Sequence, residues 1–223
     1  MAKDAYQIFK ETCTRACHAR HACADGYKQM LAAENVSQMM NTWRCNWEDI
    51  VESKYADIIC IELPKHYSAL KAEMNQSGIY LNECPTNAKS FVSVLITDFK
   101  DVVHVYGDAK AYIIGKAEVH GHDHSQIYNS KIDDAVVALY DYAFGKILSG
   151  KVTAYNRSSL QTSCVAVLDG SVKCSAFGGN VYACAYREVY ASRDTVVYSN
   201  SRRNIFLHGT AHIEPLNLKD IYE

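Results

Sequence analysis

The sequence predicts an α+β protein in which an N-terminal helical domain caps a C-terminal β-solenoid. Apolar residues recur every eight positions in the second half of the chain: Val103, Ala111, Val119, Ile127, Ala135 and Ala143, then Val181, Val189, Val197, Ile205 and Ile213. Within each unit apolar and polar residues alternate, which is typical of a strand. The first seventy or so residues instead show the three-and-four spacing of amphipathic helices. A short unit cannot bury its apolar face alone, so the units are expected to stack.

Turn-forming segments divide the chain of 223 residues. We expect a helical cap domain over residues 1–78, a junction with the first strand over 79–100, a solenoid over 101–215 and a C-terminal tail over 216–223. The solenoid unit is eight residues long, with about two units in each coil. Pro64, Pro85 and Pro215 should mark boundaries, with Pro64 ending a helix.

Helix signals are clearest near the start of the chain. Asp4 is expected to cap a first helix, and Asn35 or Ser37 a later one. The later helix carries an apolar stripe formed by Trp43, Trp47, Ile50, Val51, Ile58 and Ile59. It should end at Leu63–Pro64, with a short helix over 68–74 after it. Because the end of a solenoid exposes apolar core and unpaired backbone, covering that end is the structural role expected for these helices.

The run from Phe91 to Ile96 is almost continuously apolar. Such a run predicts a strand buried on both faces, and it is expected to join the helices to the solenoid. The eight-residue pattern slips between Gly145 and Gly179, where the assignment of faces is least secure.

The alternation also predicts which side chains face outward. Small and branched residues should fill a thin interior between two sheets, and aromatic or histidine side chains should form columns on the outer faces. A coil of sixteen residues would place Tyr112, Tyr128 and Phe144 in one column, and His104, His120 and Val136 in another. These columns either stabilise the sheets or contact a partner. The expected contact residues are Tyr112, Tyr128, Phe144, His104, His120, His122, Tyr182, Tyr190, Tyr198 and Phe206.

One short motif could carry metal chemistry. His120-Gly121-His122-Asp123-His124 resembles the H-x-H-x-D-H signature of metallo-β-lactamase-fold hydrolases, although it is one residue too short. An extended backbone would separate His120 from His124 by about 13 Å, too far to share one ion. We therefore expect no bound metal or cofactor here, and a face that meets solvent or a partner. The alternative is a metal-dependent hydrolase that uses the cluster from His120 to His124.

A second group of potential ligands lies in the first helix. Its members are Cys13, Cys17, His18, His21 and Cys23. Structural zinc usually takes two well-spaced ligand pairs, and no distant second pair is present. We expect core cysteines and surface histidines, with a zinc site as the alternative. The nine cysteines are interpreted as reduced thiols.

Composition excludes several function classes. A formal net charge of −2 gives no general attraction to nucleic acid or to an acidic membrane. The chain opens without a signal peptide and has no membrane-length apolar run, so a soluble, cytoplasmic protein is expected. Nucleotide-binding glycine loops and the G-x-S-x-G elbow are missing from the sequence. We therefore expect no catalytic residues.

The repeat Gly107-Asp108-Ala109-Lys110-Ala111 resembles that of uncharacterised helical-plus-solenoid proteins of gut-bacterial mobile elements. The resemblance covers the second half of the chain, implies a phage-like or accessory context and transfers no catalytic residue. The leading hypothesis is a non-catalytic accessory protein that binds another protein, in its sharpest form a host defence complex that it inhibits. The other alternative is a self-assembling scaffold, with a homodimer formed through the solenoid end or the tail.

Overall fold

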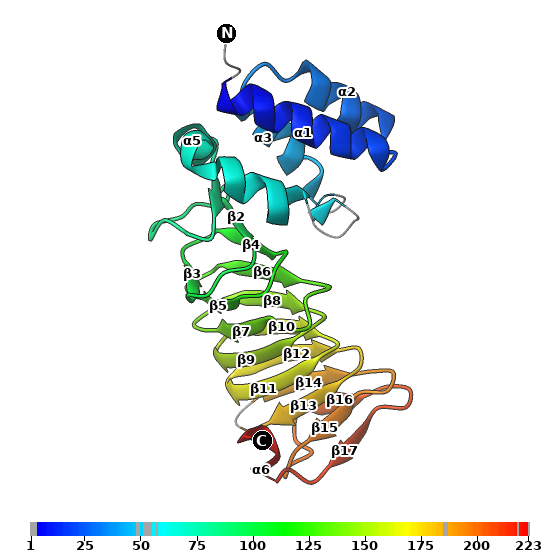
Figure 1. The fold of residues 1–223 in the computed structure, drawn as a ribbon. Helices are drawn as coiled ribbons and strands as arrows, with labels where there is room; N and C mark the ends of the chain where they lie inside the picture. The colour runs from blue at the N-terminus through cyan, green and yellow to red at the C-terminus, as the bar shows by residue number, and fades with distance from the viewer. Residues whose placement is uncertain are drawn as a thin grey trace.

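The computed structural model describes residues 4–47, 50, 55–56, 58–184, 187–217 and 219–222, with backbone alone at 220 and 222. A bundle of helices lies at one end and a tall stack of strands extends away from it (Figure 1). This arrangement confirms the expected helical domain followed by a parallel β-solenoid. Val51 of the predicted apolar stripe and Leu218 of the tail lie outside the described residues.

The helical domain contains α1 (Ala5–Ala19), α2 (Ala24–Ala32), α3 (Val36–Arg44), the π-helical turn η1 (Ile58–Glu62) and α5 (Leu63–Gln76). Two predicted caps are present. Asp4 accepts a hydrogen bond from the Gln7 amide at 2.7 Å, and Asn35 accepts one from the Gln38 amide at 3.0 Å. Each side chain satisfies an N–H group that has no partner within its helix.

The prediction that Pro64 ends a helix is wrong. Pro64 lies in the first turn of α5, directly after η1. Proline fits this position because the first-turn N–H groups have no acceptor within the helix, so its missing donor costs nothing. The short helix expected over 68–74 is therefore part of the longer helix α5.

The strands form two parallel sheets, and the chain alternates between them. The nine-stranded sheet, here sheet A, contains β1 (Ile79–Leu81), β2 (Ser93–Ile96), β4 (Lys110–Ile113), β6 (Gln126–Asn129), β8 (Phe144–Ile147), β10 (Ser159–Thr162), β12 (Val172–Ala176), β14 (Arg187–Ala191) and β16 (Ile205–Leu207). The eight-stranded sheet B contains β3 (Val103–Val105), β5 (Glu118–Gly121), β7 (Val136–Leu139), β9 (Lys151–Asn156), β11 (Val165–Gly170), β13 (Asn180–Ala183), β15 (Val196–Tyr198) and β17 (His212–Glu214).

The spacing between paired strands is not constant. Lys110 pairs with Gln126, sixteen positions on, but Gln126 pairs with Phe144, eighteen positions on. Further along, Ser159 pairs with Lys173 after only fourteen. The two extra residues shift the register by two without exchanging inside and outside, because side chains alternate with a period of two.

This shift overturns two predicted column positions. Phe144 lies beside Gln126, so Tyr128 is followed in its column by Lys146. In sheet B, Val136 pairs with Glu118, and the position after His120 is Ala138.

The interior is thin and apolar, as the alternation predicts. Ala111, Val119 and Ala135 are each fully buried, and most inward positions are alanine or valine. The backbones approach closely at Gly107, where a Cβ atom would lie 2.2 Å from the carbonyl oxygen of Ala88. Gly107 also has a φ of +62°, so two requirements favour glycine at this turn.

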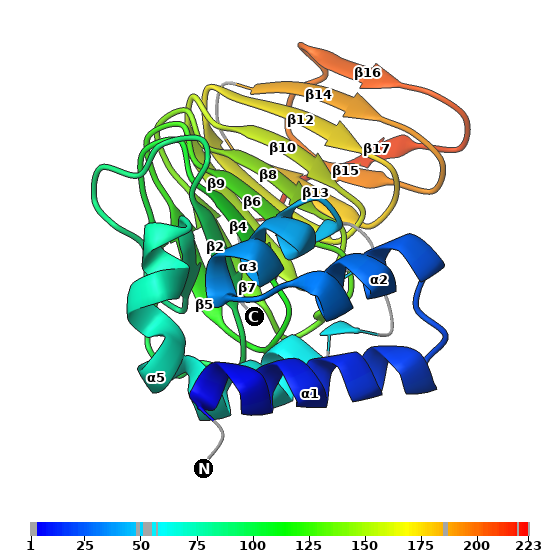
Figure 2. The same cartoon turned by 90° about the horizontal axis from the view of Figure 1, so that it is seen from above.

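The helices cover the first rungs of sheet A, at the N-terminal end of the stack (Figure 2). Every residue of β2 is buried, which confirms a doubly buried strand over 93–96. The prediction is wrong for Phe91, which lies before the strand and is exposed. Leu95 belongs to the core of the helical domain, whereas Val94 and Ile96 belong to the solenoid core. Strand β1 pairs with β2, and β2 pairs with β4. The segment expected as a junction therefore already forms rungs of sheet A.

The C-terminal end is built differently. Sheet A ends at β16 and sheet B at β17, and no described residue adds a further strand to either. The chain then reaches the short helix α6 (Lys219–Tyr222). Among the described residues, no helix has the length and apolar character needed to cross a membrane.

Candidate functional site

The outer face of sheet B carries a continuous column of four rings. His122 stacks on Tyr106 with a centroid distance of 5.0 Å and on Tyr140 at 5.1 Å, and Tyr140 stacks on Tyr155 at 4.9 Å. These distances match the rise between parallel rungs, so the solenoid itself sets the stacking. Tyr106, Tyr140 and Tyr155 were not among the expected contact residues. The outward parity of Tyr106 and Tyr140, shared with His104 and His120, was the available signal for these two. Tyr155 has the opposite parity, because in β9 Val152 and Ala154 are the inward residues.

A second column runs beside the first. His104 pairs with His120, and small or branched residues follow at Ala138 and in the next two strands. The column becomes aromatic again at Tyr182 and Tyr198, whose rings stack with a centroid distance of 4.8 Å.

The two columns bring three histidines together near the N-terminal end of sheet B. His104 and His120 lie in register on adjacent strands, and His122 follows the end of β5 on the same outer face. The Nδ1 atom of His104 lies 3.0 Å from Nε2 of His122. One ring nitrogen from each of the three lies within 4.8 Å of the others, and no other such group occurs among the described histidines, cysteines and carboxylates. We call these three residues the histidine cluster.

His124 does not belong to the histidine cluster. The backbone takes a left-handed conformation at Asp123, with a φ of +56°, where the chain turns out of β5. The exposed His124 ring stacks on Tyr142 instead, at a centroid distance of 5.2 Å. The residue that joins His120 and His122 is His104, which the stacking of coils supplies from the preceding rung of sheet B.

The environment of His122 favours its neutral imidazole. Burial, followed by the charges of His104 and His120, lowers the pKa of His122 below its ordinary value of 6.5, although Asp141 and Asp123 act in the opposite direction. His120 Nε2 lies 2.9 Å from a carboxylate oxygen of Glu118. A neutral imidazole can offer a nitrogen lone pair to a ligand, which a protonated ring cannot.

The predicted aromatic residues of sheet A have different environments. Tyr112 is partly buried against Trp47 of the helical domain, with ring centroids 5.7 Å apart, and so forms part of the cap interface. Tyr128 stacks on Tyr112 at 5.3 Å and meets Phe144 edge-on at 6.3 Å, despite the shifted register. At the far end, Tyr190 and Phe206 stack at 4.8 Å and are about half exposed.

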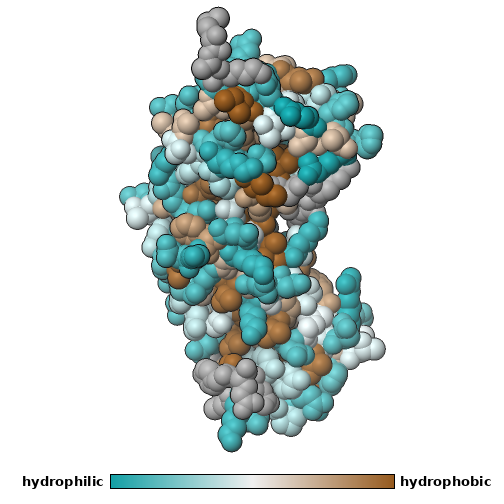
Figure 3. Space-filling model, viewed as in Figure 1, coloured by the Kyte–Doolittle hydropathy of each residue, from teal (hydrophilic) through white to brown (hydrophobic). Residues whose placement is uncertain are grey.

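The exposed surface is mixed in character. On the face shown in Figure 3, hydrophobic residues form patches among hydrophilic ones over both the helical end and the solenoid. The exposed large hydrophobic residues include Tyr190, Phe206 and Leu207, which belong to the last two strands of sheet A.

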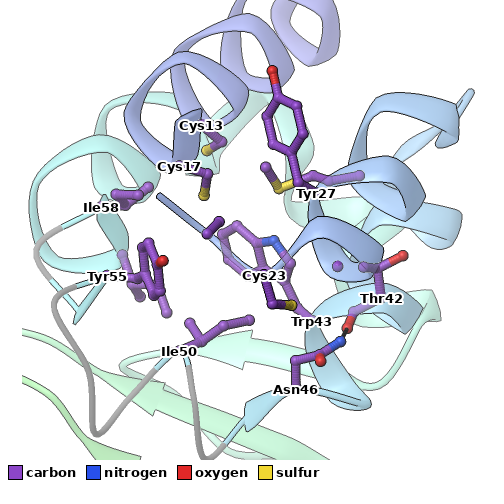
Figure 4. Close-up of a pocket in the computed structure, with 14 residues that line it drawn as sticks. Cys13, Cys17, Cys23, Tyr27, Thr42, Trp43, Asn46, Ile50, Tyr55 and Ile58 are labelled. Carbon is purple, nitrogen blue, oxygen red and sulfur yellow. Dashed lines mark hydrogen bonds between the residues drawn. The ribbon is translucent and has the colours of Figure 1, made fainter. Parts of the chain in front are cut away.

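The helical domain contains a partly open apolar pocket of about 230 Å³ between α1, α2, α3 and η1 (Figure 4). Cys13, Cys17 and Cys23 line it together with Trp43 and Tyr27. Cys13 is fully buried and burial raises the pKa of its thiol, which disfavours the thiolate that binds metals. His18 and His21 are exposed. Among the described residues, this cysteine and histidine group does not converge as a set of metal ligands.

Comparisons with protein-family models, with curated proteins and with solved structures gave no match.

Proposed function

We propose that this chain is a non-catalytic binding protein whose solenoid takes up an extended segment of a partner protein along the open edge of β16. The observation that carries the proposal is the solvent exposure of Leu207. This residue pairs with the buried Ala191 and therefore has an inward register, yet it is 43% exposed. It is exposed because no described strand follows β16, so the last apolar layer of sheet A is uncovered.

The backbone of β16 offers hydrogen bonds to such a segment. Asn204 accepts from the Val189 amide, and the His208 amide donates to Ala191. Because alternate residues of a parallel strand bond to the same side, the amide of Leu207 points to the open edge. Addition of a strand to an exposed edge is an established mode of peptide recognition, in which the main chain supplies affinity and alternate side chains supply specificity.

The side chains around β16 define the partner's chemistry. A new strand would continue the outer column of Tyr190 and Phe206, where an aromatic residue could stack. Arg202 and Arg203 precede β16 and His208 follows it, all of them exposed. We infer that the partner segment alternates apolar and aromatic residues and carries acidic residues at its ends. The resemblance to mobile-element proteins suggests a host protein, and a defence complex is the class to test first.

A peptide titration tests the proposal. The probe has the sequence Glu-Glu-Val-Tyr-Val-Glu-Glu, and its control replaces each glutamate with lysine. Leu207→Pro removes the outward amide without removing a bond to β14, and Leu207→Thr keeps the amide as a matched variant. We expect the acidic peptide to bind the wild type and Leu207→Thr, and about tenfold more weakly to Leu207→Pro. Equal binding to all three proteins, or preference for the lysine peptide, would contradict the proposal.

The same edge could instead accept a second copy of the chain, as in the homodimer or scaffold considered from the sequence. Light scattering across a wide concentration range separates the two occupants. If the edge binds a foreign partner, the chain should be a monomer in the absence of peptide. Concentration-dependent self-association that Leu207→Pro abolishes would assign the edge to a second copy.

A further inference from the structure

We propose that His104, His120 and His122 form a binding site for a divalent transition metal ion of the zinc class. The inference is independent of the open edge of β16, because it rests on a different sheet near the opposite end of the solenoid. It departs from the sequence-based expectation of a protein without metal. The expectation changes because the third histidine near His120 and His122 is His104 and not the distant His124. The three can therefore converge on one ion.

The spacing of the ring nitrogens suits one small ion. His104 Nδ1 and His122 Nε2 are 3.0 Å apart. Two imidazole nitrogens on a tetrahedral ion, with bonds of about 2.0–2.1 Å, are separated by about 3.3 Å. The observed distance differs from this value by a few tenths of an ångström. Metal binding would replace the present contact between these nitrogens and draw in the nitrogen from His120.

The rings are held by their surroundings. The His122 ring is held between Tyr106 and Tyr140, with interplanar angles of 17° and 8°. His120 meets Tyr140 edge-on at 5.7 Å, and Tyr106 stacks on His104 at 6.0 Å. Such packing limits the rotamers that each histidine can adopt, so metal binding would cost little side-chain conformational entropy.

Glu118 supplies a supporting contact. Its carboxylate can accept a hydrogen bond from the Nε2–H of His120, which leaves the lone pair of that neutral imidazole on Nδ1. A carboxylate that orients a ligating imidazole in this way is common around zinc, where it fixes the tautomer and raises ligand basicity.

The donor set selects the ion. Three neutral imidazoles suit Zn²⁺, Cu²⁺ and Ni²⁺, whereas Mg²⁺ and Ca²⁺ prefer oxygen ligands. Affinity should follow the usual order for divalent ions, with Cu²⁺ strongest. Three protein ligands would leave a further coordination position for water.

A calorimetric titration with Zn²⁺ tests the site. The full chain is first treated with a chelator to remove adventitious metal, and the chelator is then removed. Co²⁺ provides a second readout through its visible absorption bands. The variants are His104→Ala and His122→Ala. His124→Ala is the matched control, because it removes an exposed histidine two positions from the cluster that stacks on Tyr142 outside it. Thermal melting of each metal-free protein checks folding, and His104→Gln replaces His104→Ala if that variant unfolds.

We expect the wild type to bind one equivalent of Zn²⁺. Loss of His104 or His122 should weaken binding by about a hundredfold or more, and Glu118→Gln by about tenfold, while His124→Ala stays close to the wild type. Failure of the wild type to bind Zn²⁺ would overturn the proposal. A loss in His124→Ala as large as that in His104→Ala would also overturn it, because binding would then depend on exposed histidines in general.

Discussion

His104 Nδ1 and His122 Nε2 lie 3.0 Å apart although eighteen positions separate the two residues in the chain. One residue lies in β3 and the other just beyond β5, the next strand of the same sheet. The contact is therefore made by the stacking of coils and by no local motif. The same stacking aligns the other outward rings, and no described residue adds a strand to sheet A beyond β16.

The assignment of inside and outside can be tested by two substitutions. Val119 is fully buried, so Val119→Asp would place an unpaired charge in the thin core and should cost several kcal/mol in the free energy of unfolding. Tyr128→Ser should cost less, about 1 kcal/mol, because it removes packing between rungs and a hydrogen bond to Gln126 on the partly exposed outer face. Urea unfolding measures both values. The reverse ranking would mean that the two faces have been exchanged.

The close approach at Gly107 gives a second prediction. Gly107→Ala would combine a positive φ with a Cβ atom placed against the backbone oxygen of Ala88. At Gly209 the φ is +68°, but the nearest atom to an added Cβ is 3.7 Å away. Gly209→Ala should therefore cost about 1 kcal/mol from backbone conformation alone, and Gly107→Ala clearly more. Equal losses in urea unfolding would show that the turn at Gly107 can move away from Ala88.

A carboxylate near the cap gives a prediction about pH. Burial would raise the pKa of Glu83, but hydrogen bonds from Lys71 and Tyr67 outweigh burial and lower it below 4.5. A lowered folded-state pKa stabilises the fold above the unfolded-state pKa, and this stabilisation is lost as the pH falls through the folded-state value. The melting temperature of the wild type should therefore exceed that of Glu83→Gln near neutral pH.

That difference should shrink as the pH is lowered below about 4. Thermal melts of both proteins across this range provide the measurement. A difference in melting temperature that stays constant down to about pH 3 would show that the carboxylate charge contributes nothing.

The fold could be predicted from the sequence because a regular repeat of apolar residues indicates stacked strands. The inward positions of Ala111, Val119 and Ala135 follow from parity alone, which the two-residue insertion before Ala135 does not disturb. The column position of Phe144 did not follow, because that insertion changes which residue lies beside it. A constant period of sixteen cannot detect such a shift.

The candidate sites could be predicted from the sequence only in part. His120 and His122 are visible as a local motif, but their third member, His104, depends on the register between coils. The exposure of Leu207 could not be anticipated either, because it depends on whether another strand follows β16 in space. Both features arise from pairing between strands, which a pattern along the chain does not contain.

Amide hydrogen exchange at Leu207 tests the proposed binding edge most directly. The Val189 amide, which donates to Asn204 within sheet A, serves as the internal reference. We predict that the Leu207 amide exchanges much faster than that of Val189 in the free chain and becomes protected when the acidic peptide is added at saturation. Slow exchange at Leu207 in the free protein, or fast exchange that the peptide leaves unchanged, would contradict the account.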